Sequence, residues 1–418
     1  MKPCRPQLEL SLADAQAAIA AQLAPLAAES VPLRLAQGRI CAADCLARLS
    51  IPSCDQSARD GFAVAAAPLF AEQGFAVFHI AGEIAAGCAA ANTLAPGQAF
   101  RIMTGAAAPF GTARVLPFEV CQEKDGHVHA PLAELATAQR QIRCQGCEVR
   151  SGQVLAAAGT RLLADHLRLL AEDGCEEVAA HRRPRAVVVC TGSELAQAGM
   201  PLPTGGKISG NGALLAALLE AQGCVCVRAL VARDDADSLA ALLTERMEQD
   251  QPDLIITTGG MGPGKFDLTE QVFDQLGGEM VCNRLRLRPG RATLFGLLNG
   301  RLPFFGLPGP PPAVRLLFHE LVMPALARLQ GEDMAGGLLR ARLDGPPPAL
   351  QPDCTVLKSA VAWADEEGQL RARPTEGLEP PNAILHLRSG EEGLVSLRLI
   401  GPLAAAGSEG RRRQPVRR

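Results

Sequence analysis

The sequence has 418 residues and a formal net charge of −3, and 48% of its residues are hydrophobic while 20% are charged. This length predicts about two to four domains, and the composition is typical of a globular protein rather than a disordered one. Tyr is absent, Trp occurs once and aromatic residues total 3%, so neither charge nor aromatic content favours binding to nucleic acid.

The opening stretch MKPCRPQLELSLADAQ lacks the apolar core of a signal peptide, and no apolar run approaches the roughly 18 residues that span a bilayer. We therefore expect a cytoplasmic protein without a membrane segment. In a reducing compartment most of the 14 cysteines are expected to be free thiols. Cys144 and Cys147 form a C-x-x-C, but no second such motif or histidine pair completes a zinc set, which favours ordinary thiols.

The first predicted element is an amphipathic helix. Ser11 and Asp14 form a capping-box-like S-x-x-D pattern, and an Ala/Leu-rich stretch follows as far as about Ala28. A second helical pattern, over residues 160–180, ends near Gly174. We expect these two helices to pack together, with the segment between them forming an insertion.

That intervening segment has a different pattern. From Cys54 to about Gly152, short apolar runs such as FAVFHI and ARVLPFEV alternate with Gly and Pro. Short runs bounded by turn residues are typical of strands, so the insertion is predicted to be rich in β-structure.

From Pro184 onward, strands and helices alternate. Apolar, β-branched runs predict strands at RAVVVCTG, VCVRALVA, DLIITTGG, RATLFG and RLPFFGLPG. Helical periodicity is found in NGALLAALLEAQGC, DSLAALLTERMEQD and AVRLLFHELVMPALARLQG. This alternation predicts a right-handed, mostly parallel α/β sheet, in which ligands bind at the C-terminal ends of the strands.

After Gly331 a Pro-rich break and several short strand-like runs predict a small all-β C-terminal domain, followed by a tail that is expected to be disordered. The expected fold is therefore a multidomain α/β protein. Its expected parts are residues 1–53 with 145–180 (N-terminal helical and linker domain), 54–144 (inserted β-rich domain), 181–332 (α/β domain), 333–405 (C-terminal β domain) and 406–418 (basic tail).

Four strand ends contain Gly-rich motifs suited to an oxyanion. In VVVCTGSEL, a tight turn at Gly192 can offer hydroxyls and backbone N–H groups, and the glycines of DLIITTGGMGPGKFD allow backbone amides to approach an anion closely. RLRLRPGRATLFG holds four arginines within eight positions, the first three on one face of a strand. FFGLPGPPPAV forms a rigid turn before a helix.

Each motif alone also has a structural interpretation, since a Gly turn is common and an Arg stripe is usually a solvated face. Their combination with the carboxylates Glu194, Asp234 and Asp267 at predicted strand ends favours a binding site. No G-x-x-x-x-G-K-[ST] motif is present, which disfavours a P-loop nucleotidase, and GGMGPG does not match the dinucleotide-binding G-x-G-x-x-G.

Seven motifs together resemble the successive signatures of the molybdopterin molybdenumtransferase family, which includes bacterial MoeA and the E domain of gephyrin. They are DQSARDGFAV, GEIAAG, RIMTGAAAP, CTGSEL, IITTGGMGPGKFD, RPGRATLFG and GLPG, and they span roughly residues 10–335. The resemblance implies an elongated homodimer of four-domain subunits, a central MogA-like molybdopterin-binding domain and a site in a cleft between protomers. The implied ligands are adenylylated molybdopterin, molybdate and a divalent cation, Mg²⁺.

The resemblance also implies roles for individual residues. The implied catalytic residues are Asp55, Asp60, Thr104, Asp234 and Asp267. The implied metal ligands are Glu194, Asp234 and Asp267. The implied cradle for pterin and phosphate consists of Thr191, Gly192, Ser193, Gly259, Gly260, Gly262, Arg284, Arg288, Gly306, Pro308 and Gly309.

Several positions depart from the family pattern. GGMGPG replaces G-G-V-S-V-G, RPGRA replaces K-P-G-K-P, and GLPGPPPA replaces G-L-P-G-N-P-V-S. Pro310 and Ala313 thereby remove an amide side chain, a hydroxyl and a backbone donor. Three functions remain open: an active transferase, a non-catalytic paralogue that stores or delivers the cofactor, and a scaffold. Molybdopterin adenylyltransferase and client molybdoenzymes are the partners to consider, with no nucleic acid and no membrane.

Overall fold

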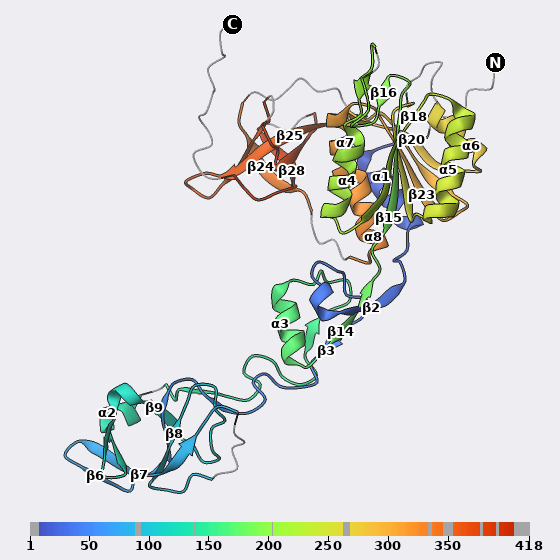
Figure 1. Ribbon diagram of the computed structural model, residues 1–418. Helices are drawn as coiled ribbons and strands as arrows, with labels where there is room; N and C mark the ends of the chain where they lie inside the picture. The colour runs from blue at the N-terminus through green and yellow to red at the C-terminus, as the bar shows by residue number, and fades with distance from the viewer. Residues whose placement is uncertain are drawn as a thin grey trace.

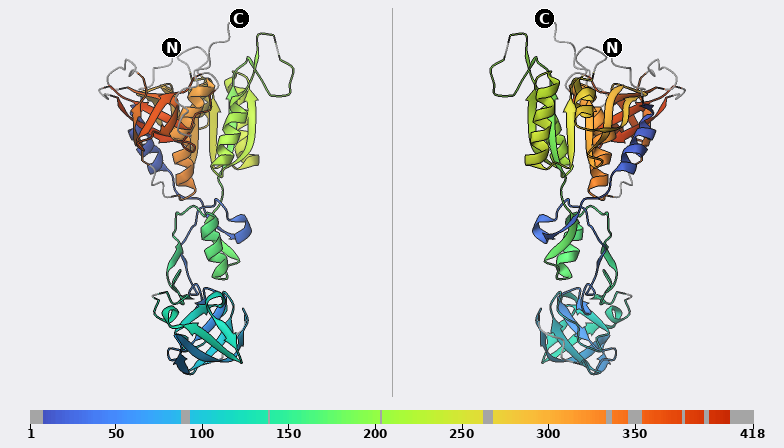
Figure 2. Two further views of the ribbon diagram at one scale, coloured as in Figure 1. Left: turned by 90° about the vertical axis from the view of Figure 1, so that its left-hand side faces the viewer. Right: turned by 90° about the vertical axis from the view of Figure 1, so that its right-hand side faces the viewer.

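The computed structural model describes residues 8–87, 93–137, 139–202, 204–261, 268–332, 337–345, 354–376, 379–389 and 393–404. The chain is elongated (Figures 1 and 2), with an α/β domain and a C-terminal β domain at one end, a narrow middle domain, and an inserted β domain at the other end. Among the described residues, no helix is long and apolar enough to cross a membrane.

The α/β domain is built on one seven-stranded sheet in the order β1-β20-β22-β23-β19-β15-β18. Neighbouring strands from β18 to β23 are parallel, while β22 runs antiparallel to both of its neighbours, which confirms the predicted mostly parallel sheet. The strands are β1 (Glu9–Leu10), β15 (Arg185–Thr191), β18 (Val225–Ala232), β19 (Leu254–Thr258), β20 (Glu279–Leu285), β22 (Ala292–Leu298) and β23 (Leu302–Leu307).

Helices cover both faces of this sheet (Figure 1). One layer contains α1 (Leu12–Gln22), α4 (Asn211–Ala221), α7 (Pro311–Leu317), the π-helix η3 (Phe318–Val322) and α8 (Met323–Leu329). The other contains α5 (Ala236–Asp250) and α6 (Leu268–Gln275). Strand β15 is buried on both sides, because Val188 packs in the first layer and Val187 and Val189 pack in the second.

Helix α1 belongs to the α/β domain, which corrects one prediction. Ser11 caps it by accepting the Asp14 N–H at 3.1 Å, as the capping pattern predicts. The helix ends at Gln22, however, and its buried residues pack with η3 and α8, not with α3 (Ala164–Glu172). The reason is that β1 joins the sheet beside β20 and holds the chain start there.

The middle domain is formed by two separate passes of the chain. Strand β2 (Ala28–Pro32) pairs with β14 (Glu177–His181), and β3 (Cys45–Leu46) pairs with β13 (Val154–Ala156). Helix α3 packs against β13. The core of this domain is separate from that of the sheet and includes Val31, Leu162 and Leu170.

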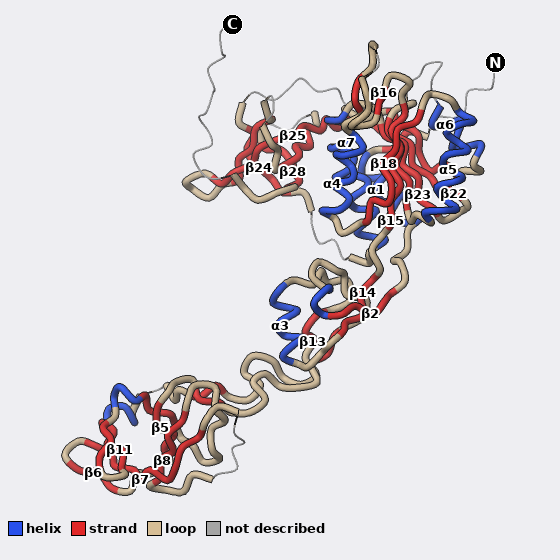
Figure 3. The backbone as a smooth tube through the Cα atoms, viewed as in Figure 1, coloured by secondary structure: helices blue, strands red, loops and turns tan. Residues whose placement is uncertain are grey.

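The described residues of the inserted domain form a seven-stranded sheet, which confirms the predicted β-rich insertion. Its strands are β5 (Gly61–Val64), β6 (Phe70–Glu72), β7 (Phe75–Ile84), β8 (Gln98–Ile102), β9 (Arg114–Pro117), β10 (Gln122–Lys124) and β11 (His127–Pro131). Two chain passes connect this domain to the middle domain (Figure 3), and there β4 (Gln56–Ser57) pairs with β12 (Ile142–Arg143). We call this connection the neck.

The C-terminal domain is all β, as predicted, and its strands close into a barrel in the order β25-β26-β24-β28-β27, since β27 also pairs with β25. Its strands are β24 (Leu339–Leu343), β25 (Thr355–Ala364), β26 (Leu370–Pro374), β27 (Ala383–Leu387) and β28 (Leu394–Leu399). Strand β21 (Leu287–Arg288) adds to β25 and links the barrel to the sheet. The predicted basic tail, 406–418, lies outside the described residues.

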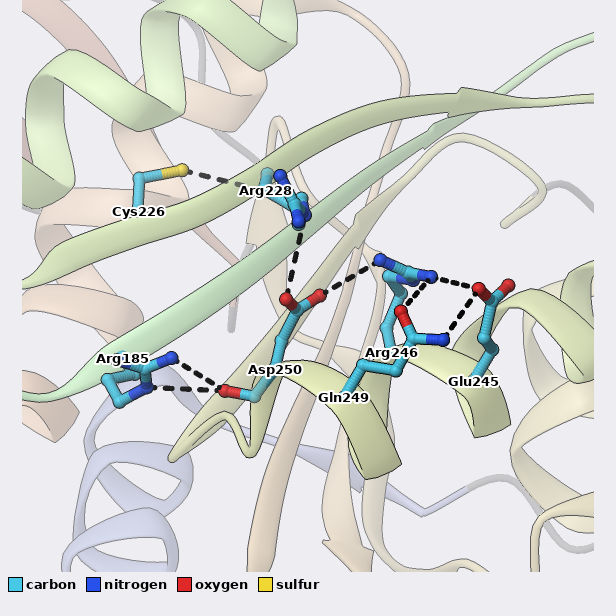
Figure 4. Close-up of polar contacts among 7 residues, drawn as sticks. All are labelled: Arg185, Cys226, Arg228, Glu245, Arg246, Gln249 and Asp250. Carbon is cyan, nitrogen blue, oxygen red and sulfur yellow. Dashed lines mark hydrogen bonds and ion pairs between the residues drawn. The ribbon is translucent and has the colours of Figure 1, made fainter.

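A polar network anchors the end of α5 (Figure 4). The carboxylate of Asp250, whose side chain is 7% exposed, lies 3.5 Å from Arg228 and 3.4 Å from Arg246. The Asp250 carbonyl accepts hydrogen bonds from Arg185 at 3.0 and 3.2 Å. The network therefore ties α5 to the first residue of β15 and to the neighbouring strand β18.

Candidate functional site

A cavity of about 810 Å³ opens at the C-terminal ends of β15 and β19 and beside the loop after β23. This is the position at which a parallel α/β sheet is expected to bind its ligand. Eight residues assigned to the site from the sequence lie in its wall: Thr191, Gly192, Glu194, Asp234, Gly259, Gly260, Pro308 and Gly309.

The floor of the cavity needs glycine at two positions. Gly259 and Gly260 have φ values of +95° and +61°, which side chains rarely adopt. A Cβ on Gly259 would lie 2.4 Å from the Thr191 carbonyl oxygen, and one on Gly260 would lie 3.0 Å from Thr269 Oγ1. The loop after β19 therefore packs directly on the end of β15 and presents bare backbone to the cavity.

Asp234 is oriented by the turn that follows β15. Its Oδ2 accepts the Ser193 N–H at 2.8 Å, and the Ser193 hydroxyl accepts the Asp234 N–H at 3.2 Å. These two bonds join the ends of β15 and β18. Ser193 thus holds Asp234 in place, although Ser193 itself does not line the cavity.

Glu194 lies beside a cation that the sequence interpretation missed. Lys207 Nζ lies 3.1 Å from Glu194 Oε1, and both residues line the cavity. A hydrogen bond from the Glu194 backbone N–H, together with Lys207, lowers the pKa of the Glu194 carboxyl. The pairing of β16 (Leu195–Ala196) with β17 (Lys207–Ile208) brings the two together, and no local sequence pattern reveals that pairing.

Asn211, the first residue of α4, was also missed. Its side-chain N–H₂ donates to Thr258 Oγ1 at 3.1 Å and to the Gly309 carbonyl at 2.8 Å. Because a carbonyl can only accept, this contact fixes which end of the amide faces Gly309. Asn211 is 7% exposed and joins three walls of the cavity. Its position at the start of a helix with apolar periodicity was the sequence signal that could have identified it as a site residue.

Three predicted catalytic residues lie away from this cavity: Asp55 directly precedes β4 in the neck, Asp60 directly precedes β5, and Thr104 follows β8 of the inserted domain. Asp60 Oδ1 accepts bonds from Thr104 N and Oγ1 at 2.7 and 2.8 Å, and these bonds lower the pKa of Asp60. Asp55 Oδ1 accepts the Gln145 N–H at 2.7 Å. The fold brings Asp60 and Thr104 into contact, but within one chain neither residue lines the cavity.

Comparison with known proteins identifies the family. Residues 10–174 match the model of the MoeA N-terminal region (domain I and II), and residues 187–328 match that of a probable molybdopterin binding domain. The chain is 34% identical over 326 residues to a molybdopterin molybdenumtransferase of Haemophilus influenzae, covering 77% of this chain and 78% of the relative. A Bacillus subtilis enzyme of the same name is 30% identical over 385 residues, covering 89% of this chain and 88% of the relative.

The chain belongs to the molybdopterin molybdenumtransferase family. A crystal structure of a MoeA protein from Pyrococcus horikoshii, 26% identical, superposes with a TM-score of 0.72 over 94% of this chain and 99% of that one. The resemblance inferred from the motifs is therefore confirmed. So is the fold class, including the MogA-like central domain.

Besides Ser193, three described residues that the family resemblance assigns to the cradle do not line the cavity. Arg284 lies on β20, near the opposite edge of the sheet from β15 and β18, and Arg288 lies on β21, which pairs with β25 of the C-terminal barrel. Leu285 and Leu287 are buried while Arg286 and Arg288 are exposed, so the chain does alternate here. Gly306 is buried in β23, where a Cβ would lie 2.9 Å from Thr269 Cγ2 and 3.0 Å from Met261 Sδ.

The carboxylates that line the cavity are the candidate ligands for the Mg²⁺ that the family resemblance implies. Within the described ranges, no three His, Cys, Asp or Glu side chains converge on a metal position. Glu194 and Asp234 nevertheless line one cavity, and two carboxylates completed by water and substrate phosphate suit Mg²⁺. Asp267 and Gly262, also assigned to the site, lie outside the described residues.

Proposed function

We propose that this family member inserts molybdate into adenylylated molybdopterin and hydrolyses the adenylyl group with the help of Mg²⁺, in a cytoplasmic pathway of molybdenum cofactor biosynthesis. The main support is the cavity at the ends of β15 and β19. There a glycine loop, two carboxylates and a lysine face one space large enough for a pterin-sized ligand.

The cavity wall suits an anionic ligand with a flat apolar body. Gly210 and Asn211 at the start of α4 line it, so the positive end of an 11-residue helix faces the cavity. Lys207 adds a full positive charge. Leu195, Ile208 and Met261 supply apolar surface. In this proposal, phosphate binds at the helix start and the pterin lies against the apolar wall.

The acidic side of the cavity would act on the adenylyl phosphate. Glu194 and Asp234 would hold Mg²⁺, which when bound polarises that phosphate for attack by water. Asp234 is suited to this role because Ser193 fixes its orientation and leaves one carboxylate oxygen for other contacts. Lys207 would balance the charge of Glu194 and hold the carboxylate at the cavity mouth.

We further propose that the protein works as a homodimer whose partner subunit supplies the second half of the site. Asp60 and Thr104 are exposed and form a preset acidic and hydroxyl pair at the opposite end of the molecule. A symmetric dimer can bring that end of one subunit to the cavity of the other. In this dimer, Arg284 and Arg288 would contact the ligand from the border between the sheet and the C-terminal barrel.

The alternative is a non-catalytic paralogue that binds molybdopterin or mature cofactor and delivers it to a client molybdoenzyme. Pro310 at the N-cap of α7 favours this reading, because it offers no N–H and no side-chain cap to the cavity that it lines. Ala313 also lacks a hydroxyl and is 3% exposed. Molybdopterin adenylyltransferase would be the donor for either function.

The deciding experiment is insertion in vitro. Purified protein is mixed with adenylylated molybdopterin, Mg²⁺ and molybdate, and product is measured by reconstitution of a cofactor-free molybdoenzyme. Turnover that requires Mg²⁺ and is lost in Asp234→Asn supports the transferase. Tight binding of the pterin without turnover would support the delivery protein instead. Absence of both binding and turnover would contradict both proposals.

A further inference from the structure

Cys144 and Cys147 lie in an exposed turn at the neck. The Cys147 N–H donates to the Cys144 carbonyl at 3.1 Å, and Gly146 at the third position has φ +69°. A β-turn keeps its first and fourth Cα atoms within about 7 Å, and a disulfide joins Cα atoms about 4.4–6.8 Å apart. The backbone of this turn is therefore compatible with a bond between the two cysteines, both of which are exposed.

A second pair, Cys41 and Cys45, provides an internal comparison. Its two sulfur atoms are 3.5 Å apart, yet Cys41 is buried and Cys45 only half-exposed. Burial, together with Cys41, raises the pKa of the Cys45 thiol to about 12. The thiolate is the form that reacts in disulfide exchange, so this close pair is chemically slow at neutral pH.

The turn that holds Cys144 and Cys147 is exposed, in contrast to the Cys41–Cys45 pair. Both thiols are open to solvent, and arginines flank the motif on either side, at Arg143 and Arg150. A Cβ placed on Gly146 would lie 3.4 Å from Arg150 Cγ, so the Arg150 stem runs alongside the turn. Arg143 is paired with Glu148 at 3.3 Å, whereas Arg150 makes no ion pair with any described residue. Because Cys144 and Cys147 are exposed, both thiols are accessible to a reagent in solution, unlike the buried thiol of Cys41.

We propose that Cys144 and Cys147 form a redox-active dithiol that low-molecular-weight disulfides convert to an intramolecular disulfide. One cysteine thiolate attacks a sulfur of the small disulfide, forms a mixed disulfide and expels a thiolate that takes up a proton. The thiolate of the second cysteine then attacks Sγ of the first cysteine, which forms the intramolecular disulfide and expels the remaining small thiolate, and this thiolate also takes up a proton. Two electrons pass from the two cysteines to the small disulfide, and no further reactant is needed.

The oxidised turn would stiffen the neck. Gln145, between the cysteines, donates its N–H to Asp55 at 2.7 Å, and the Gly146 N–H donates to the Pro52 carbonyl at 3.0 Å. These bonds hold the two chain passes together beside the inserted domain. A disulfide across the turn restricts its opening, so amide hydrogen exchange at Gln145 and Gly146 should slow. This inference goes beyond the proposed function and does not depend on it.

The test is to incubate the reduced full-length protein with oxidised glutathione near neutral pH and to map disulfides by mass spectrometry. Trypsin cleavage after Arg143 and Arg150 gives one peptide that holds both cysteines. We expect this peptide to become lighter by two hydrogens while Cys41 and Cys45 stay reduced. Cys144→Ser should instead retain one glutathione on Cys147.

Cys45→Ser is the matched control, and it should leave formation of the disulfide in the turn unchanged. Three results would overturn the proposal. They are glutathione that persists on both Cys144 and Cys147 of the unmodified chain, no reaction at either residue, and a first disulfide that forms elsewhere, such as Cys41–Cys45 or a bond to Cys54.

Discussion

Asn211 connects the start of α4 to the ends of two strands around the cavity. Its amide nitrogen bonds both Thr258 Oγ1 and the Gly309 carbonyl, so one side chain sets the relative position of three wall segments. A buried group with this many contacts is a positioning residue, because it shapes the space that a ligand would enter.

We expect Asn211→Ala to weaken molybdopterin binding about tenfold, since it leaves the Gly309 carbonyl and the Thr258 hydroxyl without their partner, at a cost of about 1–2 kcal/mol. Titration of the pterin by calorimetry measures the effect. Asn382→Ala is a suitable control, because Asn382 also bonds the backbone, at Ala362, but lies in the C-terminal barrel. Equal affinities for Asn211→Ala and the unmodified protein would show that this residue does not shape the ligand site.

The sequence alone predicted the position of single residues where their neighbours in the chain determine the geometry. Gly259 and Gly260 follow a buried strand directly, and their positive φ values explain why glycine is needed. Prediction failed where the partner is distant in the chain. Lys207 reaches Glu194 only through the β16–β17 pairing, and Gly306 is buried beneath the glycine loop rather than exposed to ligand.

The π-helix η3 buries one carboxylate at the border of two domains. Glu320 is fully buried and accepts bonds at 2.9 Å from His386 of β27 and from Arg398 of β28. Gln16 of α1 also donates to its carbonyl at 2.8 Å. This cluster joins α1, η3 and the C-terminal barrel, and we refer to it as the Glu320 clamp.

We expect Glu320→Gln to lower the free energy of unfolding by about 3–5 kcal/mol, because Arg398 would keep its buried charge without a counter-charge. Burial alone raises the pKa of Glu320, but the bonds from His386 and Arg398 hold it below the usual 4.5. A carboxyl with a depressed pKa stabilises the fold above its unfolded pKa, and that contribution is lost as the pH falls through the folded value. Urea unfolding across a pH series provides the measurement.

The difference between the unmodified protein and Glu320→Gln should therefore be constant near neutral pH and shrink only in acid, below about pH 4.5. A difference that disappears already near neutral pH would mean that the carboxylate of Glu320 is not the group that stabilises the interface.

The end of α5 offers a second test with a control in the same network (Figure 4). Asp250→Asn should destabilise the protein by about 1–3 kcal/mol, because the Asp250 side chain is buried and forms ion pairs with Arg228 and Arg246. Glu245→Gln removes a partner of the same Arg246, but Glu245 is 50% exposed, so the loss should stay below about 1 kcal/mol. Thermal unfolding of both variants separates the two cases, and similar losses would contradict the role given to burial.

Most of the strands and helices after Pro184 could be predicted, because the strands are continuous apolar runs and the helices carry a clear apolar period. Strand β20 and helix α6 were not identified, since EMVCNRL and LTEQVFDQ are short and mix polar with apolar residues. The end of α1 could not be placed, because its Ala-rich continuation fits a helix as well. The turn away from the sheet into β2 is set by pairing with β14, far along the chain.

For the whole molecule, the distance between the cavity and the Asp60–Thr104 pair leads to a test of the proposed dimer. Asp60→Asn and Glu194→Gln should each abolish insertion with little loss of stability, because both carboxylates lie near the surface. Mixing the two variants under subunit exchange should restore about a quarter of the activity, since half of the dimers are mixed and one of their two sites is intact.

No recovery after demonstrated exchange would mean that Asp60 and Glu194 of the same chain act together. The sequence could not resolve this point, because each half of the site follows a recognisable motif while the distance between the halves depends on the middle domain. The short strand pairs of that domain, such as β3 with β13, have no periodic pattern of their own.

The geometry of the neck determines how the inserted domain can be removed from the chain. Gln56 and Arg143 face each other across the β4–β12 ladder, so the ends of the inserted domain are one strand spacing apart, about 4.8 Å. A two-residue turn spans that gap, and removal of residues 57–142 would leave the rest of the polypeptide continuous without stretching it. The inserted domain is thus a module that can be deleted, or replaced by a different domain, at the level of the gene. The α/β domain that bears the cavity would keep its own core.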